Sequence, residues 1–318
     1  MKAVVRRRYG DTSVLQLEDV DEPAVEPGWL IVDVAAAGVN MAEWHMMSGE
    51  PVVMRLATGL RAPKRPLLGQ DVAGVVAATG PGVTRFAVGD AVFGSARGSW
   101  ATRATAHEDL LQPLPKGVSF EQAAAVPMSG YTALQALRAA GDVAGKRIAI
   151  TGAAGGVGSY AVQLASSRGA HVTAVCSGSK AGFVRDLGAD DVIDYTNEDP
   201  TAAQRSFDAV LDFAGSLPLS RWKRAIRHGG TLVLGGGEEG GTILGPLSRS
   251  IRAPFTRGIT VVTLMASANG DDLAELAAGL GSGTLRSTHT RSYGFSDAAQ
   301  AVDALRAAAH PGKIVMTP

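Results

Sequence analysis

The stretch RIAITGAAGGVGSYAVQLA (147–165) restricts the possible folds of this chain more than any other part of it. A short apolar run leads at once into Gly152, Gly155, Gly156 and Gly158, and apolar residues at helical spacing follow. Glycines let the backbone turn tightly and approach a ligand, and the N-terminus of the following helix offers N–H groups to a phosphate. Because the glycines stand between a strand and a helix, the pattern predicts a dinucleotide-binding turn. A glycine-rich turn that holds no ligand is the alternative interpretation.

Strand-like and helix-like segments alternate regularly from this turn onward. The predicted strands are 147–152, 171–176, 191–195, 207–215, 230–237 and 258–266. Apolar residues at helical spacing predict helices over 159–169, 216–229 and near 271–281. Six strands with helices between them predict a doubly wound parallel sheet, the Rossmann fold of an α/β protein.

The first 122 residues follow a different pattern. Short apolar runs between Pro and Gly turns predict strands of an antiparallel barrel or sandwich, near 3–5, 30–39, 71–80 and 90–95. Ser119 and Gln122 have the spacing of a capping box, which predicts a helix over 119–127. Apolar residues at helical spacing predict a second helix over 129–141. The last helix (297–309) and strand (313–317) are expected to return to the first domain. We therefore expect a β-rich catalytic domain, residues 1–122 plus 283–318, and a Rossmann domain, residues 123–282.

The composition argues against several classes of function. Thirty basic and thirty acidic side chains give a formal net charge of zero, so no overall field attracts nucleic acid or an anionic membrane. Cys176 is the single cysteine, which excludes an intrachain disulfide and a cluster of thiolate metal ligands. The N-terminus lacks the apolar region of a signal peptide, and no apolar run is long enough to span a membrane. We expect a cytoplasmic protein without nucleic-acid or membrane partners.

The segment CSGSK (176–180) follows the second predicted strand, where NAD-binding chains usually carry an acidic residue. That carboxylate accepts hydrogen bonds from the ribose hydroxyls and would repel a 2′-phosphate. Here Ser177 and Ser179 offer hydroxyls, Lys180 offers a positive charge, and Tyr195 ends the neighbouring strand. The segment therefore predicts NADPH as the cofactor. The alternative is that Lys180 is a solvated residue of the first helical turn.

The chain resembles the zinc-independent quinone oxidoreductase branch of the medium-chain dehydrogenase/reductase superfamily over nearly its whole length. The segments that carry the resemblance are GVNMAEWHMMSGEP (38–51), LLGQDVAGVVAATGPGVTRFAVGDAVFG (67–94), AAAVPMSGYTALQAL (123–137), the glycine turn with the residues that follow it, and the terminal Gly312-Lys313. The glycine motif and the 67–94 segment are specific for the branch but do not identify a substrate.

The resemblance implies a GroES-like catalytic domain beside the Rossmann domain, NADPH as cofactor and a homodimer. It also carries roles over to the positions that match. These are Gly155, Gly156, Val157 and Gly158 for the pyrophosphate, Ser177, Lys180 and Tyr195 for the 2′-phosphate, Asn40 and Thr132 for the nicotinamide end, Phe213, Gly235 and Gly236 for the rest of the groove, and Lys313 as a further cofactor-binding candidate.

Two stretches differ from those of zinc-dependent relatives. Zinc alcohol dehydrogenases carry a Cys and a Gly-His-Glu stretch in the catalytic domain, where this chain has GVNMAE (38–43) and GQDVAG (69–74). We therefore expect no bound metal. Without a Lewis acid, direct alcohol oxidation loses its usual way of stabilising an alkoxide. Hydride addition to a quinone or to an activated C=C bond needs only hydrogen-bond donors and a proton source.

The proton donor is not evident from the sequence. Many relatives have a Tyr eleven positions after the residue that corresponds to Asn40, and here that position is Pro51. His45 is a candidate to bind a substrate carbonyl or deliver a proton, and a partly exposed histidine with a local partner is the alternative. Tyr131 is a candidate near the nicotinamide, with a packing role as its alternative. Asn40, His45 and Tyr131 are the predicted catalytic residues.

Three hypotheses for the function follow. The first is a metal-free NADPH-dependent reductase of small quinones or α,β-unsaturated carbonyl compounds. The second is a dedicated enoyl or ketone reductase that acts on one bulky intermediate, and the third is a non-catalytic NADPH-binding redox sensor. The strand 258–266 is expected at the edge of its sheet, where it could pair with a second copy of the chain. The segment 237–258 is expected to border the substrate cleft or to contribute to the dimer.

Overall fold

A computed structural model describes residues 1–236 and 257–318, so most of the segment 237–258 lies outside the described residues. The chain forms two compact units: unit 1 comprises Met1–Tyr131 and Ala268–Pro318, and unit 2 comprises Thr132–Ser267. The expected domain boundaries were 122 and 283. The difference at the second boundary arises because helix α10 (Gly270–Ser282) packs on unit 1, where Leu273 lies against Gly94 and Leu276 against Gly130.

Unit 2 contains the predicted parallel sheet. Its strands are β8 (Arg147–Thr151), β9 (His171–Cys176), β10 (Asp191–Asp194), β11 (Phe207–Asp212), β12 (Ile226–Leu234) and β13 (Thr260–Thr263). They lie in the order β10-β9-β8-β11-β12-β13, and every neighbouring pair is parallel. This is the strand order of the dinucleotide-binding Rossmann fold, so the predicted fold class is confirmed. β13 is an edge strand, and its pairing with a second copy stays a prediction.

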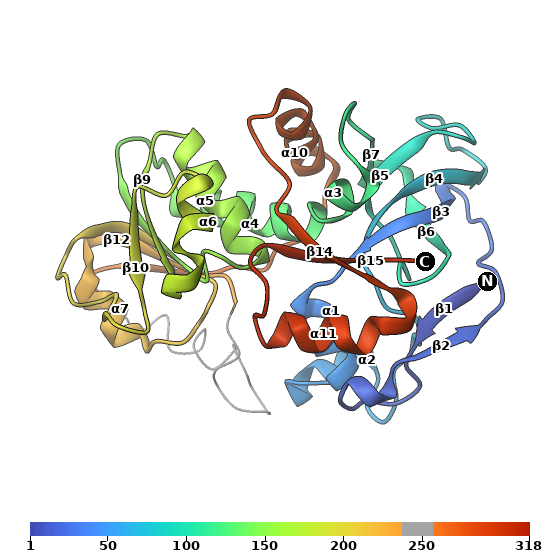
Figure 1. Ribbon diagram of the computed structural model, residues 1–318, viewed down its shortest axis with the longest axis horizontal. Helices are drawn as coiled ribbons and strands as arrows, with labels where there is room; N and C mark the ends of the chain where they lie inside the picture. The colour runs from blue at the N-terminus through green and yellow to red at the C-terminus, as the bar shows by residue number, and fades with distance from the viewer. Residues whose placement is uncertain (237–256) are drawn as a thin grey trace. The chain divides into compact units, whose positions relative to one another are not determined.

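The helices of unit 2 cover both faces of the sheet. They are the C-terminal part of α4 (Pro127–Ala140), α5 (Gly156–Ser167), α6 (Ala181–Asp186) and α7 (Leu219–Ala225). The strand order advances one way through α5 and α6 and the other way through α7. Right-handed crossovers therefore place α7 on the opposite face, as Figure 1 shows. The helix predicted over 216–229 was too long, because Ile226 already pairs with Phe207 as the first residue of β12.

Unit 1 is built mainly from antiparallel strands. A two-stranded sheet joins β1 (Lys2–Val5) to β2 (Gln16–Asp19). The larger sheet contains β3 (Trp29–Gly38), β4 (Asp71–Thr79), β5 (Ala91–Ser95), β6 (Arg103–His107), β7 (Leu111–Pro113), β14 (His289–Gly294) and β15 (Lys313–Thr317). Its order is β14-β15-β3-β4-β5-β7, with β6 paired to β3. Because β15 pairs with β3, the predicted return of the C-terminal segment to the first domain is confirmed.

Helices and a large apolar cluster complete unit 1. The helices are α1 (Met41–Ser48), α2 (Arg55–Thr58), α3 (Phe120–Ala124), the first turn of α4, α10 and α11 (Ala298–Arg306). Val32, Val72, Trp100 and Met316 are among the buried members of the cluster, so strands from both ends of the chain share one core. None of the helices in the ranges given above combines the length and apolar character needed to cross a membrane.

The close packing of the glycine turn gives a stability prediction. A Cβ atom on Gly158 would lie 2.1 Å from the carbonyl oxygen of Gly152, which is backbone and has little room to move. We expect Gly158→Ala to lower the free energy of unfolding by about 1–3 kcal/mol, as overpacking usually does. Thermal denaturation of the protein without ligand measures the change.

Gly182 provides the matched control. It lies in helix α6, and a Cβ on it would meet no atom within 4 Å. Gly182→Ala should leave stability unchanged or raise it by about 0.5–1 kcal/mol, because alanine favours the helix. Equal melting temperatures for the two variants would contradict a role of close packing at position 158.

Candidate functional site

The glycine turn joins β8 to α5 in unit 2. Gly152 has a positive φ of 60°, and Gly155 is the N-cap of α5. The first α-helical hydrogen bond runs from Ser159 N to Gly155 O at 3.0 Å, so the N–H groups of residues 156–158 precede the first helical donor. No acidic residue stands in the first turn of the helix. Free N–H groups at a helix N-terminus without nearby carboxylates fit a pyrophosphate.

The other predicted groove residues of unit 2 lie at the same edge of the sheet. A Cβ on Gly152 would touch Ala214 at 3.5 Å, and a Cβ on Gly235 would collide with the Phe213 ring at 2.6 Å. Phe213 follows β11 and Gly235 follows β12, so the carboxyl ends of β8, β11 and β12 meet there. Open parallel sheets bind their ligands at this edge. Close approach of the two chain segments requires glycine at position 235.

Ser177 follows β9 and is the N-cap of a 3-10 helix, Gly178–Lys180. The hydroxyls of Ser177 and Ser179 lie 3.3 Å apart, and the Tyr195 side chain is 58% exposed. Sequence reasoning missed a carboxylate beside this segment, which Asp194 supplies from the end of β10. Hydrogen bonds from the hydroxyl and backbone N–H of Thr196, and from the backbone N–H of Gly178, lower the pKa of Asp194. The segment is therefore anchored to an ionised acid on the neighbouring strand.

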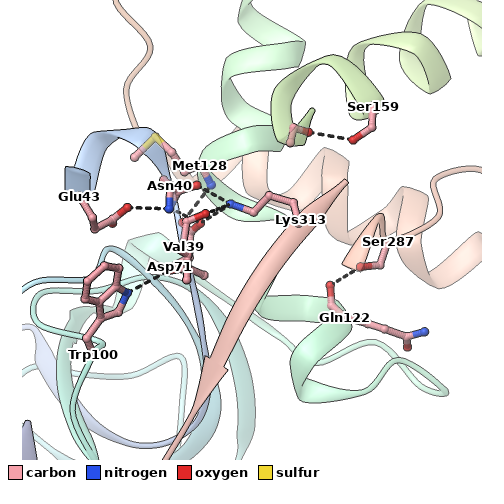
Figure 2. Close-up of polar contacts among 12 residues, drawn as sticks. Val39, Asn40, Glu43, Asp71, Trp100, Gln122, Met128, Ser159, Ser287 and Lys313 are labelled. Carbon is pink, nitrogen blue, oxygen red and sulfur yellow. Dashed lines mark hydrogen bonds and ion pairs between the residues drawn. The ribbon is translucent and has the colours of Figure 1, made fainter. Parts of the chain in front are cut away.

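The centre of unit 1 holds a buried polar cluster formed by Asn40, Glu43, Asp71 and Lys313 (Figure 2). Asn40 follows β3 and is the N-cap of α1. Asp71 opens β4, Lys313 opens β15, and both strands pair antiparallel with β3 near its end. The sheet register therefore brings an acid and a base to Asn40 from segments more than 200 residues apart in the sequence.

Hydrogen bonds connect this cluster closely. The Nζ atom of Lys313 donates to Val39 O at 3.0 Å and to Asn40 Oδ1, and it lies 3.9 Å from Asp71 Oδ2. Asn40 Nδ2 donates to the same Asp71 oxygen at 2.9 Å. The backbone N–H of Met128 donates to Asp71 Oδ1 at 3.0 Å. The ammonium group of Lys313 and the carboxylate of Asp71 are thus each held by hydrogen bonds and by the opposite charge, as buried charges must be.

Glu43 lies on the other side of Asn40 and is fully buried. Its Oε2 accepts the backbone N–H of Asn40 at 2.9 Å, whereas its Oε1 has no partner within residues 1–236 and 257–318. Burial, with a further contribution from the charge of Asp71, raises the pKa of Glu43 to about 8. Glu43 is therefore protonated at neutral pH. Burial also raises the pKa of Asp71 and lowers the pKa of Lys313, and the opposite charge of each partner acts against these shifts. With their hydrogen bonds in place, we assign the pair as one ammonium group and one carboxylate.

The sequence did not reveal this cluster as a unit. Asp71 was absent from the predicted site residues, and Lys313 was expected to contact the cofactor. In the structure Lys313 is 2% exposed and its ammonium group is engaged by Val39, Asn40 and Asp71, which makes it part of the interior of unit 1. The available signal was Asp71 itself, a charged residue that opens an otherwise apolar strand and so requires a buried partner.

The two other predicted catalytic residues occupy different settings. His45 lies on α1, and its Nδ1 is 2.7 Å from the carbonyl oxygen of Glu50, which fixes the tautomer with the proton on Nδ1. Tyr131 is completely buried, and burial raises the pKa of its phenol. This burial does not decide between the packing role and proton transfer, so the catalytic role of Tyr131 stays a prediction. Thr132, the next residue, is also buried, with 8% exposure.

A metal ion does not fit the place where zinc-dependent relatives carry their ligands. The two matching stretches contribute Asn40, Glu43 and Asp71, with neither Cys nor His, and the Lys313 ammonium group lies among these oxygens. Zinc sites are built from thiolate, imidazole and carboxylate ligands. Elsewhere in the described ranges, no group of three or more His, Cys, Asp or Glu side chains is arranged for a metal.

Comparison with protein families matches both parts of the chain. Residues 26–131 match the alcohol dehydrogenase GroES-like domain, and residues 187–316 match the family described as zinc-binding dehydrogenase. The GroES-like description agrees with the β-rich part of unit 1. The second match covers most of the Rossmann unit and the C-terminal return to unit 1.

Three relatives are informative. A chloroplastic quinone-oxidoreductase homolog of Spinacia oleracea is 34% identical over 248 residues, which is 73% of this chain and 74% of the relative. A 2-methylene-furan-3-one reductase of Solanum lycopersicum is 34% identical over 247 residues, 74% of this chain and 62% of the relative. The spectinabilin polyketide synthase system protein NorB of Streptomyces orinoci is 37% identical over 300 residues, 92% of this chain and 13% of that protein.

Solved structures show the same architecture. The quinone oxidoreductase from Coxiella burnetii superposes with a TM-score of 0.88 at 28% identity, over 100% of this chain and 99% of that one. The mycobacterial protein Rv1454c, solved in complex with NADPH, superposes with a TM-score of 0.85 at 26% identity over the whole of both chains. The combination of a GroES-like domain and a Rossmann domain is therefore shared with these proteins.

The protonation of Glu43 gives a prediction for the pH dependence of stability. Its pKa is about 8 in the folded protein and 4.5 ordinarily, so the folded state holds a proton that the unfolded state has released between these values. Stability from this group is fully present below pH 4.5 and is lost as the pH rises toward 8. Glu43→Gln mimics the protonated carboxyl group. The melting temperature of the wild type should therefore fall relative to this variant between about pH 5 and pH 9.

Glu26→Gln, at an exposed carboxyl group of unit 1, is the control and should follow the wild-type curve at every pH. Parallel curves for the wild type and Glu43→Gln would show that Glu43 is ionised throughout and would overturn its assignment as a neutral acid.

Proposed function

The chain belongs to the quinone oxidoreductase-like branch of the medium-chain dehydrogenase/reductase superfamily, and we propose that it is a metal-free, NADPH-dependent reductase of quinones or of the C=C bond of α,β-unsaturated carbonyl compounds. The chain is an oxidoreductase that uses a nicotinamide cofactor. The finer proposal is carried by the centre of unit 1, where an ammonium group and an amide stand in place of metal ligands. Such a site offers hydrogen bonds to a developing anion, which suits acceptors that are already electrophilic.

The cofactor is assigned to the carboxyl edge of the sheet in unit 2. The N–H groups of Gly156, Val157 and Gly158 hold the pyrophosphate, because they are the amides of α5 that precede the first helical bond. Phe213, Gly235 and Gly236 are assigned to the groove beside the turn, where the two glycines allow the Phe213 residue to approach closely. When bound, the nicotinamide supplies the hydride. Asn40 and Thr132 are assigned to its end of the cofactor by resemblance.

NADPH is proposed over NADH because of the segment after β9. Ser177 and Lys180 offer a hydroxyl and a cation. The exposed Tyr195 follows β10, and its backbone N–H donates to the carbonyl oxygen of Cys176, the residue before Ser177. Asp194 is a carboxylate near this place, but its oxygens already accept hydrogen bonds from Thr196 and Asn197. The carboxylate oxygens of Asp194 are therefore already used within the protein. No acidic residue at the end of the second strand is left to bind the ribose hydroxyls, as one does in NAD-binding chains.

His45 and solvent are the proposed proton sources. The Nδ1 atom of His45 is held by the Glu50 carbonyl group, and its Nε2 atom has no hydrogen-bond partner in the part of the chain that the structure describes. An imidazole oriented in this way can donate from Nε2 when protonated. Pro51, which replaces the Tyr of many relatives, follows a cis peptide bond directly after Glu50. Pro51 has no proton to transfer, and it directly follows Glu50, whose carbonyl group holds His45.

A second candidate function is reduction of the C=C bond of one bulky, carrier-bound or synthase-bound intermediate. The observation in its favour is the 37% identity over 300 residues to part of a polyketide synthase system protein, which exceeds the identity to the quinone oxidoreductase homolog. The two candidates use the same hydride chemistry and differ in the size of the acceptor.

The general proposal is tested by oxidation of NADPH, followed by its absorbance, in the presence of a chelator. We expect turnover with at least one member of a panel of simple quinones and small enones, because neither acceptor requires a Lewis acid. Tight NADPH binding without turnover on the whole panel would reject the generic reductase. Turnover only with enoyl thioesters of long chains would favour the second candidate.

Lys180→Ala tests the cofactor proposal. Loss of a charge-assisted contact should weaken NADPH binding by about 10- to 100-fold and leave NADH binding nearly unchanged. Calorimetric titration of both cofactors gives the two dissociation constants. Lys223→Ala, at an exposed lysine of α7, is the matched control and should affect neither. Equal losses for NADPH and NADH in Lys180→Ala would contradict a 2′-phosphate site at this segment.

A further inference from the structure

The orientation of the Asn40 amide follows from the chemistry of its two neighbours. The ammonium group of Lys313 can only donate hydrogen bonds, so the atom that faces it is the amide oxygen. The carboxylate of Asp71 can only accept hydrogen bonds, so the Asn40 atom that faces it is the amide nitrogen. A reversed amide would place N–H groups against a cation and an oxygen against a carboxylate. Both neighbours therefore exclude the reversed amide.

This orientation leaves one defined hydrogen-bond donor. Asn40 Nδ2 carries two N–H groups, and Asp71 accepts one of them. Within residues 1–236 and 257–318 no acceptor engages the second N–H, which can therefore be offered to a ligand. Because the amide oxygen is bound to an ammonium group, the amide is polarised and its remaining N–H is a stronger donor. Asn40 is 7% exposed, so the donor is held at the edge of the interior with little freedom to turn.

Burying Glu43, Asp71 and Lys313 together costs free energy of desolvation, which an apolar core at the same place would not cost. A buried pair replaced by apolar residues of similar volume is often as stable or more stable. The cluster is nevertheless complete: Lys313 is engaged by three groups, and Asp71 accepts two hydrogen bonds and forms an ion pair with Lys313. A function that needs Asn40 in one orientation accounts for this arrangement.

We propose that Lys313 is a positioning residue of the reductase, whose ammonium group is a built-in cation that fixes the Asn40 amide with one N–H available to an oxygen of the substrate or cofactor. The inference rests on the proposed reductase function. It assigns Lys313 to the interior of the catalytic unit in place of the expected contact with the dinucleotide. It also explains what replaces zinc at the stretches 38–43 and 69–74: Lys313 supplies a positive charge beside Asn40 and Asp71.

The test is chemical rescue of Lys313→Ala. This variant removes the outer methylene groups and the ammonium group, which together match n-propylammonium in shape and charge. We expect kcat for NADPH oxidation to fall by about 10- to 100-fold, because the Asn40 amide is no longer held in position. The change in KM should be smaller. Saturable recovery of kcat and of the melting temperature by n-propylammonium is the expected result, with 1-propanol ineffective. Lys116→Ala, at an exposed lysine of unit 1, should behave as the wild type.

The outcomes separate this inference from the proposed function. A wild-type protein that reduces no acceptor shows that the reductase proposal fails. An active wild type with unchanged kcat in Lys313→Ala, or a variant whose melting temperature recovers with n-propylammonium while kcat does not, overturns the positioning role.

A double variant covers the case in which Lys313→Ala does not fold. Lys313→Met combined with Asp71→Asn removes both charges and keeps the side-chain volumes. The amide introduced at position 71 offers an N–H where the carboxylate offered an oxygen, so the Asn40 amide loses its fixed direction. A folded double variant with low kcat supports the inference, and one with wild-type kcat refutes it.

Discussion

The buried contact of Lys313 with Asn40 and Asp71 is the interaction on which the strand arrangement of unit 1 depends most. It joins the end of β3 to the first residues of β4 and β15, so three strands are fixed in register at one point. A Cβ on Gly38 would lie 2.8 Å from the Ala124 carbonyl oxygen, so close approach beside the cluster requires glycine. Removing one partner of a buried pair costs about 3–5 kcal/mol. The C-terminal strand is therefore tied to the rest of unit 1 by charge as well as by the sheet.

Much of unit 2 could be predicted because its signals are local. Buried parallel strands are short apolar runs, and a glycine turn between a strand and a helix is compatible with few folds besides the dinucleotide-binding one. The residues assigned to the groove, such as Phe213 and Gly235, follow strands of that pattern and lie together because parallel strands end at one edge. The error at α7 was also local, since Ile226–Gly229 satisfy a helical pattern equally well. Pairing with Phe207 decides between the two.

The polar cluster and the acid near Ser177 could not be predicted in the same way. Lys313 and Asn40 are 273 residues apart, and only the register of β15 on β3 brings them together. A lysine before an apolar strand normally indicates a solvated strand end. Asp194 ends β10 and contacts a segment that follows β9, so a search for an acid along one strand overlooks it. In both cases the decisive information is which strands are neighbours.

The charge balance of the cluster bears on the kind of acceptor the enzyme can reduce. With Glu43 neutral, one ammonium group and one carboxylate cancel, and Asn40 offers a polarised N–H without a net positive charge. One such donor is worth about 3–4 kcal/mol to a developing oxyanion. This is enough for an enolate or a hydroquinone anion, whose charge is delocalised. An alkoxide concentrates its charge on one oxygen and usually needs a metal ion. Under the proposed function, the same four residues that hold the strands together would favour conjugated acceptors over simple ketones.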